Sequence, residues 1–422
     1  MKLEGWDTVF LVKEDRLNTM LRENAGELVL DFCVEIPDGT GATASGKFSA
    51  WQIAQGGSNE IIHLRLPIAE GKLIRDGVSI DLTGMTLVVA TYLDWLSTSA
   101  NAVKLQLDYD RLGERDNPPN RGELSVVTLL DPNGVLSPSD NALLSFQLGS
   151  FLVANADKVR FVFATVNLVP PQTNSWLTPV KSAYAYFHRE GLGEGCLAIF
   201  SVTSDKDISN LQKKVDPIAW PVSTEASYVV SAELFLLNVI APGLATAFNT
   251  DTSAFAYDST QDLLVNTRPL NAKSVKSGAI TYYPRATQLE VKSGDAELRT
   301  HCEGDCDMKA GIMMTYKVTS KNAATYEPGN GSLAFAPDPD PVSSHKADIP
   351  WWFFIGGPIV ILITELVVSI ISSDIASDIS KENKERLALK KHPPESILVG
   401  DDGRLVVSDI AVAGALIIRG SV

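Results

Sequence analysis

Residues 351–371 constrain the fold of this chain more than any other stretch. They read WWFFIGGPIVILITELVVSII, and nowhere else are apolar side chains so dense. Their length matches that of a bilayer-spanning helix, because about 20 apolar residues cross the hydrocarbon core. Pro358 and a central carboxylate, Glu365, interrupt the stretch. The segment must therefore either enter a membrane or be covered by the rest of the protein.

Length and charge limit the organisation and the partners of the chain. It has 422 residues, of which 45% are hydrophobic, and this length favours two or three domains. The formal net charge is -15. Nucleic acid is excluded as a partner, since phosphate binding needs clustered Lys and Arg. The acidity also weakens attraction to anionic membranes, so we expect any lipid contact to be mainly apolar.

The cysteines and the N-terminal residues indicate the cellular compartment in which the protein is expected. Four cysteines are too few for a disulfide scaffold in a chain of this size. Residues 1–10 show no secretion signal, so we expect a cytoplasmic protein or one released without a classical signal peptide. Cys302 and Cys306 are interpreted as two thiols of one turn, and they are the first pair expected to bridge in an oxidising compartment. No metal site is expected there, because a second pair of ligands is missing.

Much of the chain alternates between apolar and polar side chains with a period of two. Ile62, Leu64 and Leu66 begin one such run, and the pattern is typical of antiparallel strands with one buried and one wet face. Turn residues separate the runs. The sequence predicts strands at 62–68, 78–82, 103–107, 159–166, 197–202, 280–283, 289–291, 312–318, 405–407 and 415–418.

Fewer segments carry apolar residues at helical spacing. Ser139 or Asp140 is expected to cap the second of these helices, Pro242-Gly243 to end or kink the third, and Gly357-Pro358 to start the fourth. The order of helix, strands and long helix occurs twice, without detectable identity between the halves. The predicted class is therefore α+β. The predicted helices lie at 17–21, 144–152, 228–241 and 358–390.

Several short motifs resemble those of one protein family. They are Gly5-Trp6-Asp7-Thr8-Val9-Phe10, Leu17-Asn18, Phe163-Ala164-Thr165-Val166-Asn167-Leu168, Trp176-Leu177-Thr178-Pro179 and Ser182-Ala183-Tyr184-Ala185-Tyr186. In these motifs the chain resembles the forty-seven-kilodalton and OrfX proteins of clostridial neurotoxin gene clusters, over essentially its full length. The motifs are structural signatures rather than catalytic ones.

The resemblance implies a tubular lipid-binding (TULIP) fold similar to that of bactericidal permeability-increasing protein (BPI). It implies two TULIP-like units, each a curved antiparallel sheet wrapped around long helices, joined by a central sheet. We expect the first unit at residues 1–170, connecting strands at 171–217 and the second unit at 218–422. The resemblance also implies a bacterial, non-enzymatic accessory protein without cofactors. Such a protein binds apolar lipid chains, with phospholipid and phosphoinositide as candidates, and acts beside a toxin or another protein assembly.

The apolar helices supply the candidate site. A lipid pocket needs a continuous apolar lining, but the same side chains could fill the core by packing on the sheets, and both interpretations stay open. The aromatic residues at 351–354 are the best candidates for contact with lipid or a partner. The candidate contact residues are Leu144, Leu148, Phe151, Leu152, Val229, Leu236, Val239, Ile240, Trp351, Trp352, Phe353, Phe354, Ile359, Ile363 and Leu366.

Three alternatives to lipid binding follow from the same residues. A protein with this fold and a tunnel filled by side chains would be a scaffold for partners. A single-pass membrane protein anchored by residues 351–371 is less favoured, because Glu365 costs roughly 2.5 kcal/mol or more on insertion. We instead expect strands to cover the segment, with Glu365 at a polar partner or in solvent. An enzyme is not expected, since residues 191–195 lack the context of a phosphate-binding loop and no G-x-S-x-G or H-E-x-x-H motif occurs.

Overall fold

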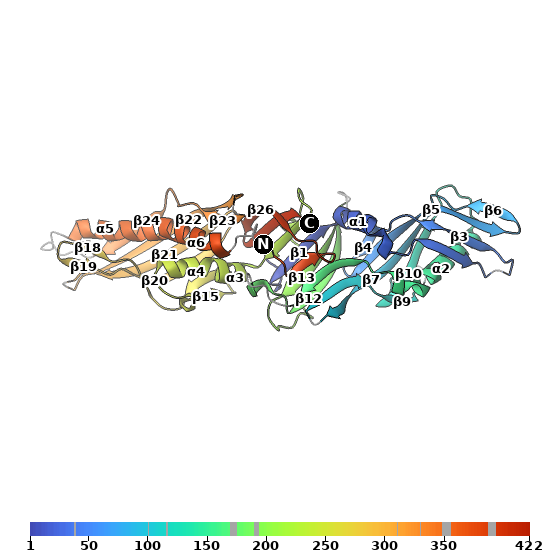
Figure 1. The fold of residues 1–422 in the computed structure, drawn as a ribbon. Helices are drawn as coiled ribbons and strands as arrows, with labels where there is room; N and C mark the ends of the chain where they lie inside the picture. The colour runs from blue at the N-terminus through green and yellow to red at the C-terminus, as the bar shows by residue number, and fades with distance from the viewer. Residues whose placement is uncertain are drawn as a thin grey trace.

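The chain folds into an elongated molecule with a large sheet toward each end and another sheet between them (Figure 1). Residues 31–167 form most of one end, residues 232–386 form most of the other, and both termini lie near the middle (Figure 1). The computed structural model describes residues 1–37, 39–99, 101–114, 117–168, 175–189, 194–309, 311–329, 331–347, 356–386 and 394–422.

The sheet at the N-terminal end of the rod uses residues 31–167 and one short strand from near the C-terminus. Helix α2 (Pro138–Ala154) packs on it with Leu144, Leu148 and Leu152 fully buried. Ser137 caps this helix by accepting a hydrogen bond from the Asp140 amide at 3.1 Å. The strands are β2 (Asp31–Glu35), β3 (Thr43–Phe48), β4 (Gln52–Ser58), β5 (Ile61–Arg75), β6 (Val78–Asp81), β7 (Thr86–Ser99), β8 (Ala102–Leu107), β9 (Tyr109–Leu112), β10 (Gly122–Leu130), β11 (Val162–Asn167) and β25 (Ile397–Val399).

The sheet at the opposite end is built from neighbouring antiparallel strands. Long strands β20, β21 and β22 pair in sequence order, and a separate hairpin precedes them. The strands are β15 (Phe255–Asp258), β16 (Leu263–Asn266), β17 (Leu270–Asn271), β20 (Arg285–Ser293), β21 (Glu297–Asp307), β22 (Met313–Glu327), β23 (Ser332–Phe335) and β24 (Val342–Ala347), with β18 (Val275–Ser277) and β19 (Ile280–Tyr282) in the hairpin.

Two interrupted helices cover this second sheet. The shorter consists of α3 (Ala232–Phe235), a π-helical turn (Leu236–Ile240) and α4 (Ala241–Ala247). The longer consists of α5 (Gly356–Ser369), a π-helical turn (Ile370–Asp374) and α6 (Ile375–Arg386). They touch where Gly243 of α4 meets Ile379 of α6, so closely that a Cβ at residue 243 would lie 2.5 Å from the Ile379 Cα.

The central sheet joins the start, the middle and the end of the sequence. Its strand order is β12 (Lys181–Arg189), β13 (Glu194–Val202), β1 (Thr8–Lys13), β14 (Ala226–Val230), β27 (Ala415–Ser421) and β26 (Val406–Ala413). One face contributes Phe10 and Tyr228 to the main hydrophobic core. The other face contributes Leu11 and Val229 to a smaller core that also contains Trp6. Both faces are therefore covered, which explains the continuous apolar runs of these strands.

Short helical turns complete the secondary structure. Helix α1 (Glu14–Glu23) follows β1 directly and buries Leu17 and Leu21. The 3-10 turns are Ala25–Glu27, Ala156–Lys158, Ser175–Leu177, Pro217–Ala219 and Thr252–Ala254.

The α+β class and the predominance of antiparallel sheet are confirmed. The helices predicted near residues 17–21 and 144–152 are present, and the last helix begins as predicted, at Gly356 with Pro358 in its first turn. The predicted end of that helix at residue 390 lies outside the described residues, where α6 is followed to Arg386. The division of the chain at residues 170 and 217 stays a prediction.

Four details of the prediction are wrong. Residues 228–230 belong to β14, because a strand buried on both faces has the same apolar run as a buried helix. Pro242 does not end its helix, which continues to Ala247, and the π-helical turn just before it accommodates the missing N–H; the predicted kink stays a prediction. The cap of α2 is Ser137, rather than Ser139 or Asp140.

The fourth concerns Cys302 and Cys306, which lie on strand β21 and not in a turn. Four residues along a strand separate the two by roughly 13 Å, since each residue advances about 3.3 Å. A disulfide requires Cα atoms within about 7 Å. Both thiols are free and buried, so the geometry of the strand excludes the bridge that an oxidising compartment would have favoured.

Candidate functional site

The longest apolar helix of the described residues runs from α5 through α6 along the second sheet (Figure 1). Residues 358–384 form a helix long and apolar enough to cross a membrane, by length and composition only, and an 18-residue window within it has a mean hydropathy of 2.2. One face is embedded in the protein. Ile359, Ile363 and Val367 are all at most 2% exposed. The opposite face of the first turns carries Ile361 and Leu362, which are 54% and 44% exposed.

The prediction that strands cover this helix on most sides is therefore correct for one face only. Strands β22 and β24 and the β18–β19 hairpin contact α5. Glu365 lies on the exposed face and reaches solvent, which is one of the two outcomes predicted for it. The sequence could not distinguish the two faces, because nearly every residue of the stretch is apolar and a helical period needs a polar face.

Buried polar side chains fix the helix to its sheet. The Asn322 side chain of β22 is fully buried and donates to the carbonyl oxygens of Ser372 at 2.7 Å and Ala336 at 3.0 Å. The Asn383 amide of α6 donates to Leu333 O at 3.2 Å, and Phe335 N donates to Ser380 Oγ at 2.8 Å. The Ser372 carbonyl belongs to the π-helical turn, where an ordinary helical hydrogen bond is displaced. Sequence reasoning missed these residues, since a single polar residue in a strand or helix gives no signal of its partner.

The other candidate helices lie inside the protein. Leu144, Leu148 and Leu152 on α2, and Leu236, Val239 and Ile240 around the π-helical turn before α4, are fully buried in the same hydrophobic core as Ile359 and Ile363. Phe151 and Leu366 are partly buried and pack against that core. Val229 is buried in the smaller core on the other face of the central sheet. Trp351, Trp352, Phe353 and Phe354 lie outside the described residues.

The hydrophobic core brings residues from distant helices together. This arrangement does not show whether they line a lipid pocket or simply fill the core. Close packing is evident between α2 and its sheet. A Cβ at Gly149 of α2 would lie 2.6 Å from Val126 Cγ2 of β10, so helix and strand touch directly at that point. The role of these residues as a lipid lining stays a prediction.

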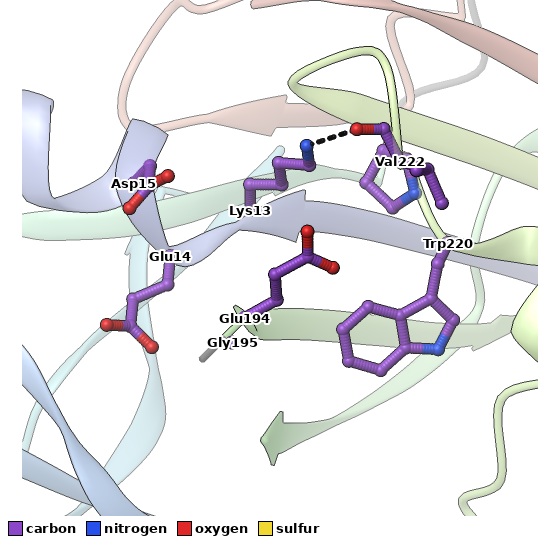
Figure 2. A pocket seen from close by; sticks show the side chains of 8 residues that line it. Lys13, Glu14, Asp15, Glu194, Gly195, Trp220 and Val222 are labelled. Atoms are coloured by element: carbon purple, nitrogen blue, oxygen red, sulfur yellow. Dashed lines mark hydrogen bonds between the residues drawn. The ribbon is translucent and has the colours of Figure 1, made fainter. Parts of the chain in front are cut away.

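The pockets at the central sheet have linings that mix polar and apolar residues. Figure 2 shows a small one, of about 30 Å³, lined by Lys13, Glu14, Asp15, Glu194, Gly195, Trp220, Pro221 and Val222. Lys13 Nζ donates to Val222 O at 2.7 Å across its rim. Burial raises the pKa of the Glu14 carboxyl, although hydrogen bonding by the Tyr186 phenol opposes the change. This volume is about that of one water molecule, so the pocket does not fit an acyl chain.

Larger clefts also flank the central sheet. One of about 630 Å³ includes Glu60 and Lys213, which form an ion pair at its wall. Another of about 570 Å³ includes Lys206 and Asp7, paired at 2.6 Å. Within the described ranges, no group of three or more His, Cys, Asp or Glu side chains could hold a metal ion. The absence of catalysis and of cofactors stays a prediction.

Known proteins with similar sequences and structures identify the family. A family model described as OrfX-like, Protein OrfX2/OrfX3/P47, matches residues 3–380. Protein P47 of Clostridium botulinum (strain Kyoto / Type A2) is 25% identical over 354 residues, which cover 82% of this chain and 83% of that protein. Protein OrfX3 of the same strain is 25% identical over 270 residues, 58% of this chain and 54% of OrfX3.

Solved structures show the same fold. The structure of P47 from Clostridium botulinum A2 superimposes with a TM-score of 0.76 at 22% identity, covering 100% of this chain and 98% of that one. The crystal structure of P47 of Clostridium botulinum E1 gives a TM-score of 0.75 at 19% identity, with 99% of both chains covered. At such identities the likeness concerns the fold alone. Because the family model spans most of the sequence, this chain belongs to the OrfX-like family of OrfX2, OrfX3 and P47.

Proposed function

We propose that this chain is a non-enzymatic, lipid-binding accessory protein that acts beside a toxin or another protein assembly. Its family membership supports the accessory role, and its antiparallel sheets packed on apolar helices support a pair of TULIP-like units. The proposed units are residues 1–170 and 218–422, connected by 171–217. Residues 394–422 do not follow this division. Strand β25 belongs to the first sheet, and β26 and β27 belong to the central sheet. The proposed setting is the cytoplasm, or release without a classical signal peptide.

The observation that carries the proposal is the outer face of α5. A helix on the surface of a globular protein normally turns polar residues outward. Here Ile361 and Leu362 face outward beside the fully buried Ile363. Each square ångström of apolar surface left in water costs about 25 cal/mol. Contact with acyl chains would recover that free energy, and so lipid is the partner that this face fits best.

The anchoring of the helix argues against the single-pass alternative. Extraction of α5 and α6 into a bilayer would break the buried hydrogen bonds of Asn322, Asn383 and Ser380. Each broken bond would leave a buried polar group unsatisfied, at roughly 1–3 kcal/mol. The scaffold alternative is favoured by the dense packing at residues such as Gly149 and Gly243. It predicts a lipid-free protein.

Lipid extraction and vesicle flotation test the proposal. We expect mass spectrometry of the purified chain to detect co-purified lipid, or the delipidated chain to float with vesicles. A delipidated chain that stays at the bottom of the gradient with every lipid class, and that yields no extracted lipid, would refute lipid binding and leave the scaffold function. A chain that needs detergent at every stage would instead favour a membrane anchor.

A further inference from the structure

Five exposed apolar side chains gather at the outer end of the second sheet. Ile280 and Tyr283 belong to the β18–β19 hairpin and the residues after it, Met313 begins β22, and Ile361 and Leu362 lie in the first turns of α5. Their exposed fractions run from 41% for Ile280 to 62% for Tyr283. We call these five residues the tip surface.

Strand register places the tip surface at one end. Arg285, two residues after Tyr283, pairs with Asp305 of β21, and Asp307 pairs with Met313 across the next turn. The β18–β19 hairpin also contacts α5. Figure 1 shows α5, β18 and β19 together at the extreme end of the rod, with α5 running from there toward the centre. Single exposed apolar residues are ordinary on proteins, but five of them at one end of the rod indicate a contact.

The charges around the tip surface favour an anionic partner. Lys276 of β18 and Lys346 of β24 are exposed at this end, in a chain whose formal net charge is -15. The nearby Asp305 and Asp307 are paired with Arg285 and Lys309. The N-terminal end of the long helix, at Gly356, adds the positive end of its dipole.

Glu365 limits how deeply such a surface can enter an apolar phase. It lies on the exposed face of α5, four residues beyond Ile361, and thus about 6 Å further along the helix axis. Amphipathic elements that lie in a membrane interface bury their apolar groups by about 5–10 Å. The exposed apolar part of α5 before Glu365 therefore has the length of an interfacial anchor and not of a span.

We propose that the tip surface docks end-on onto the surface of an anionic phospholipid bilayer, with Ile361, Leu362 and Tyr283 in the interface. Lys276 and Lys346 contact the headgroup phosphates, and the rod stands away from the membrane. This inference rests on the proposed lipid-binding function, to which it adds the docking site, the orientation and the charge of the lipid.

Flotation of the full chain with two kinds of vesicle separates the inference from the function. The vesicles contain phosphatidylcholine alone or phosphatidylcholine with phosphatidylserine, and we expect stronger binding to the second. The double variant Ile361→Ser with Leu362→Ser should bind both kinds roughly tenfold or more weakly. Lys276→Glu with Lys346→Glu should lower binding roughly tenfold or more on the anionic vesicles alone.

A matched control variant replaces two exposed apolar side chains by serine away from the tip surface. Val78 of β6 and Val406 of β26 are 63% and 65% exposed, at the opposite end and on the central sheet. The variant Val78→Ser with Val406→Ser should bind vesicles as the wild type does. If the wild type binds vesicles and the tip variants bind equally well, the tip surface is not the docking site. If the wild type binds no vesicle, the proposed function itself fails on this test.

An environment-sensitive fluorophore reports the orientation directly. Cys33 is the exposed cysteine among the described thiols, and the other three are buried. In a Cys33→Ser background, a label attached through Tyr283→Cys should shift to shorter wavelength with anionic vesicles. The same label attached through Val78→Cys should not shift. Equal shifts at both positions would refute the end-on orientation, and a shift at Val78→Cys alone would place the docking site at the opposite end.

Discussion

The Tyr186 phenol of β12 donates a hydrogen bond to Glu14 Oε2 at the first residue of α1. Gly195 of β13 leaves the room for this contact, because a Cβ there would overlap both oxygen atoms. The carboxyl group is partly buried between the central sheet and α1, near the charges of Asp15 and His188. Burial is the largest influence on Glu14 and raises its pKa above the ordinary 4.5.

This raised pKa predicts a pH dependence of stability. Near neutral pH the folded protein carries a carboxylate that burial disfavours. As the pH falls through the raised pKa toward 4.5, the folded state takes up a proton before the unfolded state, so the Glu14 contribution to stability increases. The variant Glu14→Gln cannot titrate. Its free energy of unfolding relative to wild type should be highest near neutral pH and decline as the pH falls toward 4.5. Urea unfolding at both pH values measures the difference, and a pH-independent difference would contradict the assignment.

Ile363 and Ile361 form a matched pair on α5, one fully buried and one 54% exposed. Ile363→Ala should lower the free energy of unfolding by about 2–5 kcal/mol, because it leaves a cavity in the core. Ile361→Ala should change it by no more than about 0.5 kcal/mol. Denaturant unfolding of the two variants checks this. Equal losses of unfolding free energy in the two variants would mean that α5 does not pack on the core through the face that carries Ile363.

The thiols of the chain should differ sharply in reactivity. Burial raises the pKa of Cys302 to about 12 and that of Cys306 to about 11, and it also raises the pKa of Cys196. Since the thiolate is the reactive form, a thiol reagent should modify Cys33 alone in the native protein. Mass spectrometry before and after denaturation counts the modified residues. Oxidation should not link Cys302 to Cys306, and native labelling of either one would show that β21 opens.

Gly243 is expected to be intolerant of a side chain. Gly243→Ala would drive a methyl group into the backbone of Ile379, where α4 meets α6. We expect a loss of about 1–3 kcal/mol, as for other overpacked cores. Gly26→Ala is the control, because a Cβ there has no neighbour within 4 Å. Thermal unfolding should separate the two variants, and similar melting temperatures would mean that the helices can move apart.

Much of the secondary structure could be predicted from the period of the apolar residues. The strand at 62–68 and the helix bearing Leu144 and Leu148 each have one buried face, so their pattern repeats visibly. Residues 228–230 could not be assigned, since β14 is buried on both faces and has no period. Pairings such as β11 with β25 link residues more than 200 positions apart, and no local pattern encodes them.

The candidate site could be predicted only in outline. The sequence indicates that residues 358–371 form an apolar helix, and Pro358 indicates where it begins. It cannot indicate that Ile363 faces the core while Ile361 faces solvent, because the two side chains are chemically identical. Nor does it indicate that Asn322 holds Ser372, since this contact depends on how strand and helix meet in space.

The strand order of the central sheet also affects how the protein folds during its synthesis. Strand β1 lies between β13 and β14, and β14 pairs in turn with β27, which ends at Ser421. Because the ribosome delivers β1 before β14 and β14 before β27, the central sheet cannot close until β27 has been synthesised. Until then β14 presents an unpaired edge, and such edges favour aggregation during slow, non-local folding. Production of this protein should therefore depend on translation speed and chaperone supply more than its dense cores would suggest.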